Sequence, residues 1–196
     1  MMLLCCHVQH DADLLMRAMA LSVPARRKKA QAIRDDKTRA ASLTAGLLLQ
    51  YGLQQCGISE IDICHTQKGK PYLVGHDLHF SLSHSGDYAA CVIAKKAVGI
   101  DIQKIVTVSQ RAVARFCTEE ELQYLKHSAD YERDVIRLWA LKESWLKATD
   151  QSASDMFNAS FTLCADGTVS GPAGFEYRLY AYIPDYILAV CRSQQG

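Results

Sequence analysis

The chain has 196 residues, and its 22 Lys and Arg residues nearly balance 21 Asp and Glu residues. With a formal net charge of +1, no global basic field indicates binding to nucleic acid or to a membrane surface. A 49% hydrophobic content can supply a sizeable core, in one large domain or two small ones. The apolar start is too short for a signal peptide and no run approaches a membrane span, so we expect a cytoplasmic protein.

The first third of the chain predicts one strand followed by helices. A short strand is expected at 3–9, followed by a polar, helix-compatible stretch. Ser22 and Pro24 are typical of an N-cap and a first-turn proline, here at the start of a basic helical segment. From Asp36 to Leu53 apolar residues recur at helical spacing, which predicts a second helix.

The next stretch predicts strands joined by turns. Residues 58–64 alternate between apolar and polar like a strand, and Gly69-Lys70-Pro71-Tyr72 predicts a turn. Strands at 78–83 and 88–94 flank the polar link Ser83-His84-Ser85-Gly86-Asp87. Another strand is expected at 98–103.

The last part of the chain becomes helical again before it ends in strands. Thr118 and Glu121 have the spacing of a capping box, and residues 131–148 predict a long helix. Strands are expected at 159–164, 175–183 and 186–192. The order strand, helices, strands thus occurs on either side of about residue 98, so we predict an α+β fold with an N-terminal half 1–97 and a C-terminal half 98–196.

Eight cysteines are scattered along the chain with no Cys-x-x-Cys pair. Most lie in apolar stretches, which predicts buried, reduced thiols. Metal binding by Cys5-Cys6-His7 or by Cys64-His65 is the alternative.

Two polar residues on the strand 98–103 form the first candidate site. The two-residue period of a strand sends Val98, Ile100 and Ile102 to one face and Gly99, Asp101 and Gln103 to the other. The side chains of Asp101 and Gln103 should therefore point the same way, roughly 7 Å apart along the strand. An acid that merely ends a strand is the structural alternative.

The helix 131–148 carries the second set of candidate residues. Glu143 and Lys147 are spaced i,i+4 and share a face with Trp139, while Lys142 projects near the edge of that face. The simpler interpretation is a solvated Glu–Lys pair. If Asp101 and Glu143 converge, however, their carboxylates would repel and need a cation between them. Mg²⁺ suits such a site, because it takes one or two carboxylates together with water and phosphate oxygens.

Two further groups of polar residues are candidates for an anion site. Ser83, His84 and Ser85 cluster at the hairpin, where they either stabilise a turn or donate to phosphate oxygens; a Ser–His nucleophile pair is a third interpretation, although adjacent residues rarely reach that geometry. The most basic stretch begins at Arg26 and ends at Arg39. It forms a solvated helix face or binds an anionic ligand, to which Lys70 could add.

Four motifs in order resemble the 4′-phosphopantetheinyl transferases, in their longer, monomeric form. Gly99-Ile100-Asp101 matches the Gly-Val/Ile-Asp strand of that family, and Trp139-Ala140-Leu141-Lys142-Glu143-Ser144-Trp145-Leu146-Lys147 matches its Trp/Phe-x-x-Lys-Glu-x-x-x-Lys helix. Gly69-Lys70-Pro71 and Phe80-Ser81-Leu82-Ser83-His84-Ser85 match its Gly-Lys-Pro turn and its Phe-x-x-Ser-His-Ser segment.

The resemblance implies transfer of 4′-phosphopantetheine from coenzyme A to a serine of an acyl or peptidyl carrier protein, with Mg²⁺ as cofactor and 3′,5′-ADP as product. It implies two similar α+β halves related by pseudo-twofold symmetry, in a monomer, with coenzyme A between them. The site residues then follow by position. Glu143 and Lys147 would be catalytic; Asp101, Glu143 and Gln103 would be metal ligands; and Arg26, Lys29, Arg39, Lys70, Ser83, His84, Lys142 and Lys147 would bind coenzyme A.

One departure from the family pattern concerns the metal. The residue two after Asp101 is commonly a second acid in the family, and here it is Gln103. A neutral amide predicts weaker magnesium binding. It also leaves open a catalytically weak module that binds coenzyme A or a carrier protein. A structural protein with incidental ion pairs is the third alternative.

Overall fold

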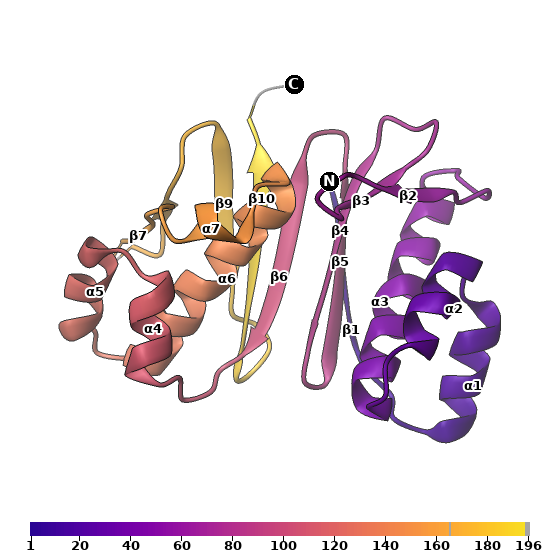
Figure 1. Ribbon diagram of the computed structural model, residues 1–196, viewed down its shortest axis with the longest axis horizontal. Coiled ribbons are helices and arrows are strands. Elements are labelled where there is room, and N and C mark those ends of the chain that lie inside the picture. Colours follow the sequence, from indigo (N-terminus) through magenta and orange to yellow (C-terminus); the bar gives the residue numbers. More distant parts are fainter. Residues whose placement is uncertain (165, 195–196) are drawn as a thin grey trace. The chain divides into compact units, whose positions relative to one another are not determined.

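The computed structural model describes residues 1–164 and 166–194, apart from the side chains of residues 25 and 153. The chain divides into two compact units, Met1–Lys95 and Lys96–Gly196. Each unit can be followed in Figure 1 by its helices and strands.

The first unit packs helices on a three-stranded antiparallel sheet. The sheet order is β1 (Met2–His7), β5 (Tyr88–Ala94) and β4 (His79–Ser85). Between β1 and β4 come α1 (Ala12–Leu21), α2 (Pro24–Gln31), α3 (Asp36–Gln55) and a small ribbon of β2 (Ile63–His65) and β3 (Pro71–Leu73). The helix α3 packs on β4 and β5, where Leu49 and Leu53 meet Phe80 and Ile93 in a buried cluster.

The second unit repeats this plan. Its sheet order is β6 (Val98–Lys104), β10 (Tyr186–Ser193) and β9 (Phe175–Tyr180), again antiparallel. Between β6 and β9 come α4 (Gln110–Phe116), α5 (Glu119–Lys126), α6 (Tyr131–Thr149), α7 (Ala153–Met156) and a ribbon of β7 (Thr162–Leu163) and β8 (Val169–Ser170). The helix α6 lies on β6 and β10, and Leu138, Leu141 and Ala189 are fully buried in this core.

Both units therefore share one topology. The first strand of each is an edge strand, the last strand is central, and the strand before the last lies on the other side. Helices and antiparallel sheets of this kind confirm the predicted α+β class. None of the described helices is both long and apolar enough to cross a bilayer.

Several helix predictions are confirmed. The helix expected at 131–148 is α6, and the helix expected from residue 36 is α3. The capping box is present: Glu121 Oε2 accepts a hydrogen bond from the backbone N–H of Thr118 at 2.8 Å. Ser22, by contrast, ends α1, where its hydroxyl donates to the carbonyl of Ala18 at 2.7 Å; Val23 is the residue that precedes Pro24 and α2.

The strand expected at 58–64 is mostly wrong. Only Ile63–His65 pairs, because β3 offers just three residues. The backbone N–H of Ile58 instead donates to the carbonyl of Leu53 at the end of α3, and the Ile58 side chain is buried in the core of the first unit. Likewise, the strand expected at 159–164 shortens to β7, and β8 was not predicted.

The prediction of mostly buried thiols is also wrong. Cys91, Cys117 and Cys191 are buried, whereas Cys5, Cys6, Cys56, Cys64 and Cys164 are exposed. Apolar neighbours in the sequence did not indicate burial here. The exposed cysteines lie on the edge strand β1, on the short strand β2, or directly after α3 and β7.

Candidate active site

The strand β6 and the helix α6 approach each other unusually closely at Gly99. A Cβ atom at this position would lie 1.9 Å from the carbonyl oxygen of Ser144 and 2.6 Å from the backbone nitrogen of Ala148. Real side chains do not tolerate such distances to backbone atoms. The glycine thus lets β6 and α6 pack backbone to backbone. This close packing brings α6 near the carboxylate of Asp101, two residues further along β6.

Asp101 is held from two sides. Its residue surface is 1% exposed, and its Oδ1 lies 2.6 Å from Nζ of Lys147, which projects from α6. Its Oδ2 accepts a hydrogen bond from Nε2 of Gln103 at 2.9 Å. The predicted common direction of Asp101 and Gln103 is therefore observed, and the amide oxygen of Gln103 is left to face other partners.

Glu143 lies within electrostatic range of this pair. Burial raises the pKa of the Glu143 carboxyl, the negative charge of Asp101 raises it further, and Lys147 opposes both effects. The carboxylates of Asp101 and Glu143 thus repel each other across one site, which is the convergence on which the magnesium hypothesis depends. Four predicted residues, namely Asp101, Gln103, Glu143 and Lys147, are brought together within the second unit.

The donor set suits Mg²⁺ better than a softer metal. Two carboxylates and an amide oxygen are hard ligands, and Mg²⁺ completes its octahedron with water and phosphate oxygens. No group of three or more His, Cys, Asp and Glu side chains able to hold a metal occurs among the described residues. The metal sites considered at Cys5-Cys6-His7 and at Cys64-His65 are therefore not formed there. A zinc-type cluster is therefore absent from this part of the chain, whereas two repelling carboxylates fit a divalent cation.

An apolar groove adjoins Glu143. It has a volume of about 730 Å³, and its lining comes from the end of β6, from α4 and α6, and from the segment that follows α6. Phe116 and Trp139 pack edge to face in its wall, with ring centroids 4.9 Å apart. Gln103 and Glu143 are among the few polar residues that line the groove, so it opens beside the paired carboxylates.

Lys142 does not join this site. It is completely buried, and its Nζ lies 2.9 Å from Oε2 of Glu121, which is also completely buried. The ammonium group further donates to the carbonyls of Met156 and Ala159. The expected contact with coenzyme A phosphates is not supported by this position, because three protein acceptors already surround the charge in the core of the second unit.

Glu121 was missed as the partner of Lys142. The sequence indicates only its capping role, in which Oε2 accepts a hydrogen bond from the backbone N–H of Thr118. The same oxygen pairs with Lys142. Its Oε1 accepts a hydrogen bond from the backbone N–H of Phe161 at 2.9 Å. The pair therefore ties α5, α6 and the segment 156–161 together. Local spacing could not have revealed a partner 21 residues away from Lys142 in the sequence.

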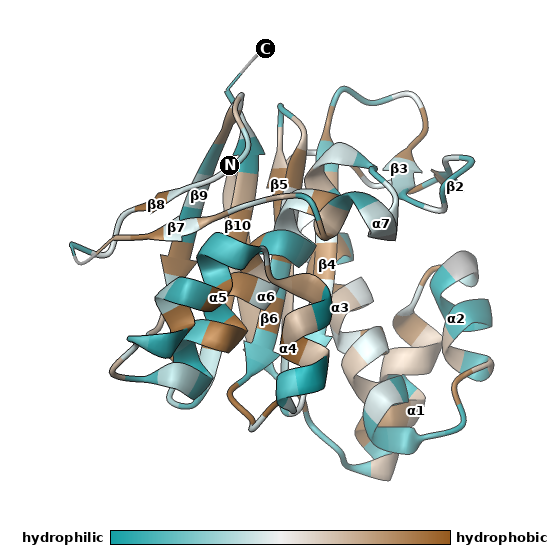
Figure 2. Ribbon diagram, turned by 60° about the vertical axis from the view of Figure 1, so that its left-hand side comes forward, coloured by the Kyte–Doolittle hydropathy of each residue, from teal (hydrophilic) through white to brown (hydrophobic). Residues whose placement is uncertain are grey.

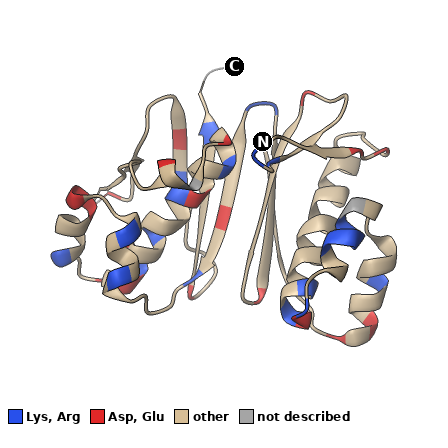
Figure 3. Ribbon diagram, in the orientation of Figure 1, with Lys and Arg blue, Asp and Glu red and all other residues tan. Residues whose placement is uncertain are grey.

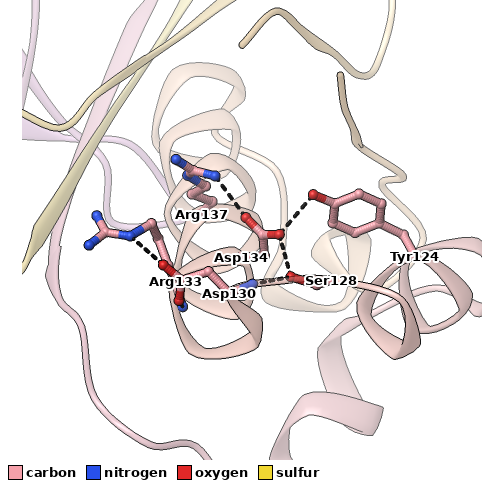
Figure 4. Close-up of polar contacts among 6 residues, drawn as sticks. All are labelled: Tyr124, Ser128, Asp130, Arg133, Asp134 and Arg137. Atoms are coloured by element: carbon pink, nitrogen blue, oxygen red, sulfur yellow. Dashed lines mark hydrogen bonds and ion pairs between the residues drawn. The ribbon is translucent and has the colours of Figure 1, made fainter. Parts of the chain in front are cut away.

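A separate polar network occupies the other side of α6 (Figure 4). Asp134 accepts hydrogen bonds from Tyr124 Oη at 2.8 Å, Ser128 Oγ at 2.7 Å and Arg137 at 2.8 Å. Glu143 lies nine positions after Asp134. Nine positions are about two and a half turns of helix, so the two side chains face opposite ways. This network anchors the α5–α6 connection and stays outside the candidate site.

The first unit contains a basic cavity of about 410 Å³. Arg26, Lys28 and Lys29 of α2 line it on one side, and His65, Pro71 and Phe80 are among the residues on the other. Figure 3 shows the positive residues gathered along α2, and Figure 2 shows the strongly polar character of that helix. Two residues that the sequence singled out, Arg26 and Lys29, are thus brought together at a hollow.

Arg26 is a half-buried cation without a counter-ion in the described part of the chain. Its side chain is half-buried, and burial lowers the pKa of its guanidinium. Its guanidinium donates a hydrogen bond to the hydroxyl of Ser42 at 3.4 Å, and no described carboxylate forms an ion pair with it. A buried positive charge that faces a cavity favours an anionic ligand there.

Arg39 lies elsewhere. Its guanidinium donates to the carbonyls of Ile33 and Arg34 and pairs with Asp36. It thereby satisfies the backbone between α2 and α3, and it does not line the basic cavity. Lys70 follows Gly69 in a turn closed by Thr66, and Gly69 and Pro71 on either side of it line the cavity.

Ser83 and His84 belong to β4 and not to the turn. The turn is Gly86-Asp87, with Gly86 at φ +52°, and the strand continues to Ser85. Adjacent strand residues point to opposite faces, and accordingly Ser83 is buried whereas His84 is exposed. A Ser–His nucleophile pair is therefore excluded at this position.

The comparisons with known proteins agree with the motifs. The family model described as the 4′-phosphopantetheinyl transferase superfamily matches residues 97–191. A 4′-phosphopantetheinyl transferase of Bacillus subtilis is 35% identical over 150 residues, which cover 72% of this chain and 66% of the relative. Sfp of Bacillus subtilis (strain 168), with the same description, is 28% identical over 190 residues, covering 89% and 84%.

The chain belongs to the 4′-phosphopantetheinyl transferase superfamily. It spans 66% of the first Bacillus relative and 44% of a third one, the transferase gsp of Aneurinibacillus migulanus, which is 33% identical over 52% of this chain. Among solved structures, the holo-[acyl-carrier-protein] synthase of Thermotoga maritima has a TM-score of 0.44 at 16% identity, covering 51% of this chain and 64% of that one. The similarity to this solved structure is weak.

Proposed function

We propose that this protein transfers 4′-phosphopantetheine from coenzyme A to a serine of an acyl or peptidyl carrier protein. The observation that carries the proposal is the convergence of Asp101, Gln103, Glu143 and Lys147 at one site within the unit that matches the family. Such a site can hold a divalent cation and a phosphate ester together.

Asp101 and Glu143 would bind Mg²⁺, with the amide oxygen of Gln103 as a third, uncharged ligand. When bound, the metal neutralises charge on the pyrophosphate of coenzyme A. Lys147, already 2.6 Å from Asp101, supplies a further positive charge at the phosphates. The roles of Lys70, Ser83 and His84 stay predictions, as do the monomeric state and the cytoplasmic location.

Glu143, or a water that it orients, would accept the proton of the carrier serine. The serine oxygen then attacks the phosphorus that bears the pantetheine arm, the bond from that phosphorus to the bridging oxygen breaks, and 3′,5′-ADP leaves. The apolar groove beside Glu143 would receive the carrier, because its wall includes residues of the segment 108–127, which follows the metal-site strand β6.

The basic cavity of the first unit would bind the 3′-phosphate end of coenzyme A. Arg26 brings a half-buried guanidinium without a described counter-ion, and Lys28 and Lys29 add two positive charges to the lining. Arg and Lys favour phosphate oxygens as partners.

Release of 3′,5′-ADP tests the proposal. Incubation with coenzyme A, Mg²⁺ and a panel of apo carrier proteins should yield one 3′,5′-ADP for each carrier modified, as measured by chromatography. Binding of coenzyme A without release for any carrier would instead favour the second candidate, a binding module. That candidate draws support from Gln103, which replaces the second acid of the family pattern.

The metal site has its own test at Gln103. In the variant Gln103→Glu, a second formal charge next to Asp101 should lower the Mg²⁺ concentration needed for half-maximal rate. An unchanged or higher requirement would remove Gln103 from the metal shell.

A further inference from the structure

Arg26 reaches the basic cavity by lying along α3 at a position where that helix has no side chain. A Cβ atom at Gly46 would lie 2.7 Å from Cγ of Arg26 and 2.9 Å from its Nε. The stem of Arg26 thus occupies the space that any other residue at 46 would fill. Ser42 is one helical turn before Gly46, so its hydroxyl meets the same side chain at the guanidinium, 3.4 Å from Nη1.

Glycine is an unfavourable residue in the middle of a helix, where alanine is the best one. Position 46 lies near the centre of α3, which runs from Asp36 to Gln55, and the residue is buried. Local helix stability therefore does not explain the glycine, whereas close packing of the Arg26 stem does.

The polar surroundings of Arg26 are consistent with a fixed orientation. Gln50 follows Gly46 by one turn and lines with Arg26 and Gly46 a void of only about 10 Å³. Its Oε1 is buried and accepts no hydrogen bond from any described residue. The gap at Gly46 accommodates the stem of Arg26, and the hydroxyl of Ser42 accepts a hydrogen bond from its guanidinium. Arg26 also lines the basic cavity.

We propose that Gly46 and Ser42 are positioning residues, which form a channel on α3 that orients the Arg26 guanidinium toward an anionic group in the basic cavity. The inference rests on the proposed function for the identity of that group, a phosphate of the coenzyme A nucleotide. Orientation before binding saves the loss of side-chain entropy that a free arginine would undergo when it captures the phosphate.

The variant Gly46→Ala tests the channel. The added methyl group should displace the Arg26 stem and weaken binding of 3′,5′-ADP about tenfold, the size of one lost charge-assisted hydrogen bond, as measured by calorimetry. The melting temperature should stay within a few degrees of the wild type. The higher helix propensity of alanine stabilises α3, and this gain offsets the packing lost when the Arg26 stem is displaced.

Two controls separate a positioning role from a general one. Gly52→Ala makes the same change in the same helix, but its methyl group would meet Ile93 and Leu4, so binding of 3′,5′-ADP should be unchanged. In the background of Arg26→Ala, Gly46→Ala should cause no further loss of affinity. Ser42→Ala, which adds no bulk, should weaken binding by a smaller factor.

The outcomes are distinguishable. If the wild type binds neither 3′,5′-ADP nor coenzyme A, the proposed function fails. If it binds and Gly46→Ala binds equally well, or if Gly46→Ala weakens binding as much without Arg26 as with it, the channel is refuted and the proposed function stands. If Gly46→Ala fails to fold, Ser42→Ala decides: unchanged affinity refutes the channel.

Discussion

A single missing methyl group at Gly99 sets the geometry of the candidate site. We expect Gly99→Ala to lower the free energy of unfolding by about 3 kcal/mol, because a Cβ would meet backbone atoms of α6 that cannot rotate away. Chemical denaturation measures this change. Gly52→Ala is the matched comparison, since its methyl group meets only side chains, and its cost should be smaller. Equal costs would show that β6 and α6 can separate easily.

The ionisation of Glu143 gives a second prediction at the scale of the residue. Burial and the charge of Asp101 raise its folded-state pKa above the unfolded value of about 4.3. A carboxyl with a raised pKa contributes stability that is fully present below the unfolded pKa and lost as pH rises through the folded pKa.

In a chelator, therefore, the wild type should lose stability relative to Glu143→Gln as the pH rises above about 4. Urea denaturation at a series of pH values measures this difference. A constant difference between the two proteins across that range would mean that Glu143 titrates normally and that its neighbours do not perturb it.

At the scale of elements, the buried pair of Glu121 and Lys142 connects three segments of the second unit. Removing one partner leaves an uncompensated buried charge, so Lys142→Met should cost about 3–5 kcal/mol in the free energy of unfolding. Glu121→Gln keeps an acceptor for the N–H of Phe161 but removes the charge. The double variant should cost less than the sum of the two single ones.

A phosphate contact predicts a different result for Lys142. In that case Lys142→Met would lower the affinity for coenzyme A at temperatures where the variant is folded, and its effects would add to those of Glu121→Gln. Additive costs in denaturation together with weaker coenzyme A binding would restore the role that the resemblance implied.

Elements with strong periodicity could be predicted from the sequence. The long helix α6 follows from apolar spacing, and β6 follows from alternation, so the shared face of Asp101 and Gln103 was predictable. The strand 58–64 could not be rejected in this way. Its alternation is real, but pairing depends on the length of a partner strand, which local pattern does not contain.

At the scale of the whole molecule, long-range partners decide which predicted residues meet. The i,i+4 spacing of Glu143 and Lys147 predicted a shared helix face, and the structure brings that face to Asp101. Lys142 is adjacent in sequence yet turns into the core toward Glu121, and Arg39 serves the backbone between two helices. Gly46 carries no chemical group at all, so only its packing against Arg26 shows its role.

The sequence indicates the repeated order of strand, helices and strands, and the structure adds the strand order that the two sheets share. Each unit places its last strand at the centre and packs one long helix on the sheet, although the sequence contains no obvious repeat. A layer of helix on sheet needs only that apolar residues face each other, and many sequences satisfy this condition. The specific residues Asp101, Glu143 and Lys147 all belong to the second unit, which the family model matches.

Intact-mass spectrometry of apo carrier proteins tests the central claim most directly. After incubation with this protein, coenzyme A and Mg²⁺, at least one carrier of a broad panel should gain the mass of one phosphopantetheine at its serine. Glu143→Ala should abolish the gain while the chain stays folded. No gain on any carrier with the wild type, or an undiminished gain with Glu143→Ala, would contradict the proposed transferase site.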